Sequence, residues 1–369
     1  MLHYYLKTRE NMQRILSCKQ NLTWILLLSG ILSTFGLDAQ DANKQSLFNS
    51  LTELEKLELV ITTDLDHIVG DRSSDEYIDG NFEVYDGKKL ISAWDVKLKH
   101  RGRFRRKLCD FPPLKLNFDK DQLKDRGLAK FDKFKLVTHC IDDKFAAQEN
   151  VVREYLAYEM YNLLSPNSYR AVLAKITYVD QNNPRNKVVR YGVLVEPTSE
   201  LEDRIGAEEV EDLVNPPAEI LNSVVENRVS LYQYMIGNED WSITMMRNLK
   251  LFQSKTTGKY ILVPYDFDFS GLVNTSYAIP SVDNGLVSVE QRIYLGKPVL
   301  ESVLAANKKH YQDQKEAIWD LIKSTKKISG EGKIYIRAYL QSFYDELDTL
   351  AIPTIADDKD ADTIGFNRK

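Results

Sequence analysis

The sequence predicts an α+β protein with two lobes, a β-rich first lobe and a helical second lobe. Segments with strand-like alternation or short apolar runs crowd the chain before residue 196, and one amphipathic helical pattern interrupts them. Beyond residue 216 the apolar spacing becomes helical. With 369 residues, of which 43% are hydrophobic and 10% aromatic, the chain has enough apolar material for a large core and too many aromatic residues for disorder.

Seven segments of the first lobe carry strand patterns, and we expect them to pair as an antiparallel sheet. They are residues 57–63, 81–85, 93–100, 114–118, 133–138, 173–179 and 188–195. The interrupting helix is predicted over 146–164, because Ser165 and Pro166 then end the pattern. In the second lobe, helices are predicted over 220–236, 298–323 and 333–349.

The first forty residues have the pattern of a cleaved signal peptide. Four basic residues precede an apolar run over 22–37, and Ala39 offers a small residue for cleavage. The run of about 16 residues is shorter than the ~20 that span a bilayer, so no stable membrane span is expected after cleavage. The sequence therefore predicts an exported protein that is periplasmic, at the cell surface or secreted. We expect four segments: a signal peptide (1–39), the β-rich lobe (40–196), the helical lobe (197–355) and a polar tail (356–369).

Charge and cysteine content narrow the range of functions. Loss of residues 1–39 removes four basic and two acidic residues, which changes the net charge from −5 to −7 and argues against nucleic-acid binding. Cys109 and Cys140 remain, and they could form a disulfide in an oxidising compartment or stay as two buried thiols. Zinc is disfavoured because the sequence has no CxxC or HxxxH spacing.

Oxygen donors gather in the segment 238–271. Asp240 and Asn248 precede an apolar strand pattern at 260–263, and Asp266 and Asp268 follow it. Phosphoryl transfer uses such a set: one carboxylate accepts a hydroxyl proton, while an amide and other carboxylates hold Mg²⁺ against phosphates. The alternative is that these residues only make turns.

A β-rich lobe with one helix, followed by a helical lobe with Asp, Asn and Asp in that order, is similar to the protein-kinase arrangement. The spacing differs, since Asn248 follows Asp240 by eight positions where kinases have five, and no HRD or GxGxxG motif is present.

Five motifs in one order resemble the CotH kinases, a family named after spore coat protein H and distantly related to protein kinases. They are RGRFRR with FPPLKLNF (101–118), the segment 134–143 that leads into the helix, YGVLVE (191–196), the Asp240 and Asn248 pair, and PYDFDFSG (264–271). The first motif departs from the family, which has Asn-Ser-Ser where this chain has Arg-Phe-Arg. The resemblance implies a divergent, two-lobed protein-kinase-like fold that uses ATP and Mg²⁺.

The resemblance also implies roles for the oxygen donors. Asp240 would be the general base, whereas Asn248 and Asp266 would be metal ligands. Asp268 would either share the metal ion bound by Asp266 or hold the turn after the strand.

Other residues would contact the nucleotide. Lys115 would pair with phosphates, and its carboxylate partner would be Glu149 or Glu154 from the helix, although Lys115 could equally point outward from its strand. Glu196 would lie near an adenine pocket, or it could cap the next turn.

The basic segment 101–107 has two interpretations. Its five positive charges, including Arg101 and Arg103, could clamp nucleotide phosphates or an acidic substrate, or they could form a solvated face.

The sequence thus predicts a CotH-like, Mg²⁺-dependent phosphotransferase acting on Ser or Thr of an envelope or secreted protein. Attachment of AMP or glutamate is an alternative chemistry for the same donors. A catalytically inactive, kinase-like module that binds a surface partner is a third hypothesis. The oligomeric state is not predicted.

Overall fold

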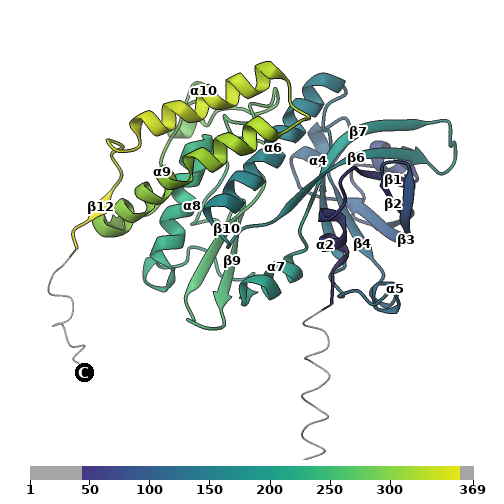
Figure 1. Ribbon diagram of the computed structural model, residues 1–369, viewed down its shortest axis with the longest axis horizontal. Coiled ribbons are helices and arrows are strands. Elements are labelled where there is room, and N and C mark those ends of the chain that lie inside the picture. The colour runs from purple at the N-terminus through teal and green to yellow at the C-terminus, as the bar shows by residue number, and fades with distance from the viewer. Residues whose placement is uncertain (1–43, 358–369) are drawn as a thin grey trace, which may run out of the picture.

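A computed structural model describes residues 44–357, and a closed seven-stranded β-barrel forms much of its first half (Figure 1). The order around the barrel is β1-β2-β3-β4-β5-β7-β6. The strands are β1 (Leu57–Thr63), β2 (Ile78–Asp86), β3 (Lys89–His100), β4 (Leu114–Phe118), β5 (Lys133–Val137), β6 (Ala171–Asp180) and β7 (Lys187–Val195). The predicted signal peptide (1–39) lies outside the described residues, as does the predicted tail (356–369) except for Ala356 and Asp357.

Alternating apolar residues explain why these segments are strands. Leu59 and Ile61 of β1, Phe82 of β2 and Leu116 of β4 are fully or almost fully buried and belong to one apolar cluster inside the barrel. Their neighbours in sequence are more exposed, as expected for a sheet with one buried face. All seven strand predictions are confirmed within a few residues at their ends.

The predicted fold class was wrong. Instead of a two-lobed protein-kinase-like fold with a helical C-lobe, the structure has a closed barrel with helices beside it. Closure depends on β1, which pairs antiparallel with β2 and parallel with β6, so that Ile61 lies opposite both Phe82 and Tyr178. Alternation predicts which residues face inward but not which distant strand completes the sheet, so the parallel β1–β6 pair could not be predicted.

Two glycines allow the barrel strands to approach one another closely. A Cβ atom added to Gly80 would lie 2.8 Å from the carbonyl oxygen of Thr62, and one added to Gly192 would lie 3.0 Å from that of Val137. Any larger residue at these positions would push neighbouring strands apart, as expected where a sheet bends sharply.

Outside the barrel, helices pack around a three-stranded sheet. The longer helices are α6 (Lys144–Leu164), α8 (Ser223–Ile236), α9 (Glu301–Ser324) and α10 (Gly330–Glu346), and the sheet has the order β10-β9-β8 with β8 (Ala207–Glu209), β9 (Leu249–Ser254) and β10 (Tyr260–Pro264). The four helical predictions are confirmed with shifts of a few residues at their ends. The shorter elements are α2 (Leu47–Thr52), α3 (Leu65–Gly70), α4 (Arg105–Leu108), α5 (Lys120–Asp125), α7 (Thr198–Ile205), η1 (Ala218–Ile220), η2 (Val282–Asn284), β11 (Val299–Leu300) and β12 (Thr354–Ile355).

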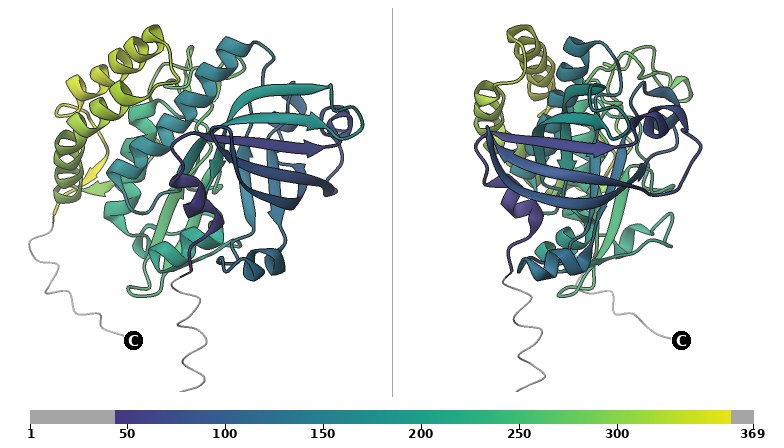
Figure 2. Two further views of the ribbon diagram at one scale, coloured as in Figure 1. Left: turned by 45° about the vertical axis from the view of Figure 1, so that its right-hand side comes forward. Right: turned by 90° about the vertical axis from the view of Figure 1, so that its right-hand side faces the viewer.

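Helix α6 joins the two halves. Figure 2 shows it running between the barrel and the helices α8 to α10, and it contacts β6 and β7 on one side and α8 and α9 on the other. Asp143 caps its first turn by accepting a hydrogen bond from the Ala146 amide, and the helix ends at Leu164, where the extended cap residue Ser165 is followed by Pro166. Val152 and Leu156 are buried in the second apolar cluster of the described chain. Polar residues on α6 are therefore held firmly at the border between the barrel and the helices.

A disulfide joins Cys109 to Cys140, 31 residues apart, which confirms the first of the two alternatives for these cysteines. It ties the segment after α4 to the segment before α6. Closing a loop of this size restricts the unfolded chain and so stabilises the fold. Between residues 44 and 357, none of the helices combines the length and apolar character that crossing a membrane requires.

Candidate functional site

A buried arginine meets three carboxylates between α4, α6 and the turn after β10. The Arg105 side chain is only 7% exposed. Its Nη1 atom lies 3.4 Å from Oε2 of Glu154, its Nε atom lies 3.3 Å from Oδ2 of Asp268, and its Nη2 atom donates to Oδ1 of Asp266. We call these four residues the arginine–carboxylate cluster. Two of its members, Asp266 and Asp268, are predicted metal ligands. Glu154 is one of the two carboxylates predicted to pair with Lys115, but the ion pair that it forms is with Arg105.

Burial and charge set the protonation of this cluster. Burial disfavours the charge on Arg105, but the three carboxylates outweigh it and raise the pKa of Arg105 well above its usual value. Burial also works against ionisation of Asp266, yet Arg105 and Arg101 hold the pKa of that carboxyl below its usual value. For the other two carboxyls burial dominates, raising the pKa of Asp268 to about 6 and that of Glu154 to about 8.

The turn after β10 presents both aspartates to the arginine. Asp266 has a left-handed backbone with φ of 66°, a conformation that Asp tolerates better than most residues. Its amide donates to the Tyr158 hydroxyl of α6 at 3.0 Å. Phe267, the residue between the two aspartates, has a fully buried side chain. The turn is thus held by α6 and by the core, so the positions of its carboxylates do not depend on solvent-exposed contacts.

Asp240 and Asn248 form a second, more exposed pair. The Asn248 side-chain amide donates to Oδ2 of Asp240 at 2.9 Å, and Nε of Arg247 lies 3.3 Å from Oδ1. Burial raises the pKa of Asp240, while Arg247 and Asn248 counteract it and the charge of Asp266 adds to it. Asn248, a predicted metal ligand, therefore turns its amide nitrogen toward the predicted base.

Lysines from three neighbouring strands form a ladder next to this region. Lys99 of β3 lies opposite Lys115 of β4, which lies opposite Lys135 of β5. We call these three residues the lysine ladder. Like charges directly opposite one another destabilise a sheet, so the ladder has a cost that a bound anion would relieve.

Lys115 and Lys135 line a cavity of about 620 Å³ together with Arg101 and Lys250. In all, seven lysine or arginine side chains and four carboxylates line it, which leaves an excess of positive charge. Burial, with the nearby charges of Arg101 and Lys250, lowers the pKa of Lys135 to about 7. Its Nζ atom lies over the rings of Tyr169 and Tyr265, and no carboxylate among residues 44–357 pairs with it. Lys135 is thus a half-buried amine inside a basic pocket, with no carboxylate partner among the described residues.

The basic pocket and the arginine–carboxylate cluster adjoin each other. Arg101 lines the pocket and Lys135 lies within it, and the charges of both lower the pKa of Asp266. Arg103 instead faces a different hollow, next to Phe104. The structure therefore brings Glu154, Asp266 and Asp268 together and places Arg101 and Lys115 in the adjoining pocket, whereas Arg103 lies elsewhere.

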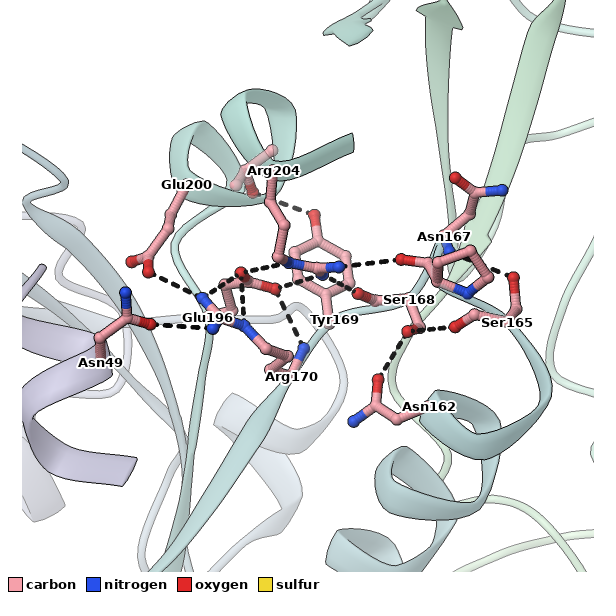
Figure 3. Close-up of polar contacts among 12 residues, drawn as sticks. Asn49, Asn162, Ser165, Asn167, Ser168, Tyr169, Arg170, Glu196, Glu200 and Arg204 are labelled. Carbon is pink, nitrogen blue, oxygen red and sulfur yellow. Dashed lines mark hydrogen bonds and ion pairs between the residues drawn. The ribbon is translucent and has the colours of Figure 1, made fainter. Parts of the chain in front are cut away.

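Glu196 lies in a separate buried network, drawn in Figure 3. Both its carboxylate oxygens accept hydrogen bonds from Arg204 and Arg170, at 2.8 to 3.1 Å. Arg170 also donates to Glu200 of α7 and to Asn49 of α2, so the network ties the barrel to these two short helices (Figure 3). Because both oxygens of Glu196 accept these hydrogen bonds, its role is to hold α2 and α7 against the end of the barrel.

Glu149 also lies away from the cluster. Its Oε1 atom accepts from the Ser329 amide at 2.7 Å, and Arg153 lies 3.6 Å from its Oε2 atom. Of the two carboxylates predicted on this helix, Glu154 is therefore the one at the candidate site.

Two residues of the site were not among the predicted ones, namely Arg105 and Lys135. Arg105 lies in the run of five positive charges at 101–107, where alternation gives no sign of which side chain turns inward. Lys135 lies between Phe134 and Leu136, and the same strand pattern that predicts its outward direction gives no sign that Tyr169 and Tyr265 cover it. Comparison with models of protein families finds no match to this chain, and comparison with curated proteins finds none either.

We expect Arg105→Met to destabilise the protein by roughly 3–5 kcal/mol at pH 8, because it leaves buried carboxylates without their cation. The loss should be smaller at pH 5, which lies below the pKa values of about 8 for Glu154 and about 6 for Asp268, so that both groups are neutral there. Urea unfolding at the two pH values measures the difference.

The control is Lys309→Met, which removes an exposed ion pair with Asp313 within one helix and should change stability by no more than about 0.5 kcal/mol. If Arg105→Met lowered the free energy of unfolding equally at both pH values, the stabilisation could not come from the charges of Glu154 and Asp268.

Proposed function

We propose that this protein is a Mg²⁺-dependent phosphotransferase, similar to CotH kinases, that transfers a phosphoryl group from ATP to Ser or Thr of an envelope or secreted protein. The observation that carries the proposal is a basic pocket that adjoins a cluster of three carboxylates, of which Glu154 and Asp268 are buried and Asp266 is partly exposed. Phosphoryl transfer requires cations around the phosphates and carboxylates for a metal ion, and it needs little else from the protein.

The basic pocket suits a polyphosphate. Its volume of about 620 Å³ lies within the range of small-molecule sites, which is about 300–1,000 Å³. Lys115, Lys135 and Arg101 would bind phosphate oxygens, and the anion would relieve the repulsion between Lys115 and Lys135. The Lys135 ammonium lies over the rings of Tyr169 and Tyr265, 4.5 and 4.8 Å from their centroids.

The carboxylates fit a hard cation. One oxygen from each of Glu154, Asp266 and Asp268 lies within 4.8 Å of the others, and carboxylate oxygens are the protein ligands that Mg²⁺ prefers. Within the described part of the chain, Oε1 of Glu154 is buried and has no hydrogen-bond partner. When bound, the metal would neutralise charge on the phosphates. Arg105 now supplies the positive charge to these carboxylates, so an ion would share them with the guanidinium or displace it.

Asp240 is the residue best suited to accept the hydroxyl proton. Its side chain is 35% exposed and can therefore be reached by an acceptor, whereas Asp268 is buried. Asn248 and Arg247 fix its orientation, and its raised pKa makes it a stronger base than an ordinary aspartate.

Export is supported by the Cys109–Cys140 disulfide, because such bonds persist in oxidising compartments. The acceptor is accordingly proposed to be a protein of the envelope or a secreted protein.

A catalytically inactive binding module is the second candidate, and Arg105 is the observation that favours it. A guanidinium that already contacts all three carboxylates satisfies much of the charge that a metal ion would neutralise. Such a protein would still bind an anion in the basic pocket.

Mg²⁺ and ATP together should raise the melting temperature of the protein spanning residues 40–369. At a ligand concentration of 100 times the dissociation constant, the stabilisation should be about 2.7 kcal/mol. Asp266→Asn should lose most of this shift, because the variant keeps the shape of the side chain but removes the charge. The matched control is Asp313→Asn on the surface of α9, which should behave as the wild type. No shift for the wild-type protein would contradict the phosphotransferase.

Binding of tripolyphosphate without metal should weaken as the pH rises above about 7. Lys135 attracts an anion only when it is protonated, its pKa in the free protein is about 7, and a bound anion would raise that pKa. Affinity should therefore be highest below pH 7 and fall above it by up to about tenfold per pH unit.

Titration calorimetry between pH 6 and 9 measures this dependence for the wild type and for Lys135→Met. The difference between the two proteins isolates the lysine from the titration of the ligand itself. An identical pH dependence in both proteins would show that Lys135 does not contact the anion.

A further inference from the structure

We propose that Arg103, Phe104, Lys107 and Leu108 form a docking surface for an acidic segment of the acceptor protein that also carries an aromatic or aliphatic side chain. We call these four residues the α4 docking surface. The inference rests on the proposed function in that it treats the docked segment as the acceptor, but the surface itself follows from contacts in and around α4.

The backbone that carries this surface is held from several directions. Arg105 points into the arginine–carboxylate cluster, and Cys109 is bonded to Cys140. The Arg106 guanidinium pairs with Asp75 and donates to the carbonyl oxygens of Arg72 and Ser73. A surface on such a held segment is already in its binding conformation, which lowers the entropic cost of binding.

The Arg72 side chain holds the same backbone from the outside. Its guanidinium donates to the carbonyl oxygens of Lys107 and Asp110, on either side of the disulfide cysteine Cys109. The fixed backbone positions therefore extend over the whole segment from 105 to 110.

The four side chains of the surface are exposed to solvent. Phe104 is 52% exposed and Leu108 is 44% exposed, and both lie on one side of α4 because they are four residues apart. Arg103 and Lys107 are likewise exposed and four residues apart, and neither side chain forms an ion pair with any residue in the range 44–357. Together they border a hollow of about 450 Å³. Two unpaired cations beside two exposed apolar groups are available for a partner.

A chain of aromatic rings connects this surface to the candidate site. The ring of Phe104 lies 5.6 Å from that of Phe269, which lies 5.8 Å from that of Tyr277. Phe269 directly follows Asp268 of the arginine–carboxylate cluster in sequence. A segment bound over Phe104 would therefore lie beside the residues proposed to carry out phosphoryl transfer, as an acceptor must.

Charge and shape select the occupant. The whole chain has a net charge of −5, so an acidic segment is repelled by most of its surface and attracted to exposed, unpaired cations. The hollow between the two apolar side chains suits a single aromatic or aliphatic side chain, whereas a lipid surface is broad and flat. We therefore favour an acidic peptide over an anionic membrane.

The test uses a fluorescein-labelled peptide of sequence Glu-Ser-Glu-Phe-Leu-Glu-Ser-Glu and fluorescence anisotropy with residues 40–369. Binding should be saturable and weaken with added salt, since exposed ion pairs are screened. R103E/K107E should bind at least about tenfold more weakly, because two attractive contacts become repulsive. The control K88E/K89E changes the net charge by the same amount in the exposed β2–β3 turn and should bind as the wild type.

Two further comparisons test the apolar part of the surface. F104S/L108S keeps both cations and should also weaken binding of this peptide. A second peptide with Ser in place of Phe and Leu should bind the wild type more weakly than the first peptide does. The two peptides should bind F104S/L108S with equal affinity. Equal binding of the first peptide by the wild type, R103E/K107E and F104S/L108S would overturn the docking surface. A second outcome would also overturn it: the wild type does not bind the peptide but binds phosphatidylglycerol vesicles, and R103E/K107E loses the vesicle binding.

The Mg²⁺-ATP melting shift, measured on the same samples, separates this inference from the proposed function. A wild-type protein that shows the shift but does not bind the peptide would refute only the α4 docking surface. A protein that binds the peptide through this surface but shows no shift would refute the phosphotransferase and leave the surface as that of a binding module.

Discussion

The contact of Arg105 with Glu154, Asp266 and Asp268 is the interaction on which the arrangement of the site depends. These residues come from α4, α6 and the turn after β10, which are far apart in the sequence. Taking ionisable groups out of water is unfavourable unless each finds a partner, and removal of one partner of a buried pair typically costs several kcal/mol. The cluster therefore holds the barrel against α6 and against the sheet of the second half, and it does so at the point where the oxygen donors gather.

A basic pocket lies beside this cluster, and the two would bind ligands of opposite charge. The basic pocket has an excess of positive charge, whereas a single guanidinium contacts all three carboxylates. A polyphosphate with a divalent cation would supply the missing negative charge to the pocket and a second positive charge to the carboxylates. This complementarity is the physical reason to propose a metal–nucleotide ligand, and it does not depend on the overall fold.

Local patterns in the sequence predicted most of the elements. Alternation located the seven barrel strands, and helical spacing located α6, α8, α9 and α10. The fold class was nevertheless wrong, because the parallel pairing of β1 with β6 joins strands over a hundred residues apart and leaves no signal in either strand. The predicted donors Asp266 and Asp268 lie together because they share one short turn.

Residues whose role depends on tertiary contacts could not be predicted in the same way. Arg105 is one of five cations in a run, and only the fold shows that it is the one that turns inward. In the sequence, Glu196 follows the end of an apolar strand. Its partners Arg170 and Arg204 come from other parts of the chain, so its ion pairs could not be predicted. Lys135 has an ordinary strand position, and the two tyrosines that partly cover it lie 34 and 130 residues further along the chain.

The most direct measurement is a crystal structure of residues 40–369 grown with Mn²⁺ and a non-hydrolysable ATP analogue, with anomalous scattering used to locate the metal. We expect an anomalous peak beside Asp266 and Asp268, phosphate density against Lys115 and Lys135, and an Arg105 side chain that has moved from its present contacts. Absence of the peak, with Arg105 still bound to all three carboxylates and no phosphate in the basic pocket, would contradict a metal–nucleotide site.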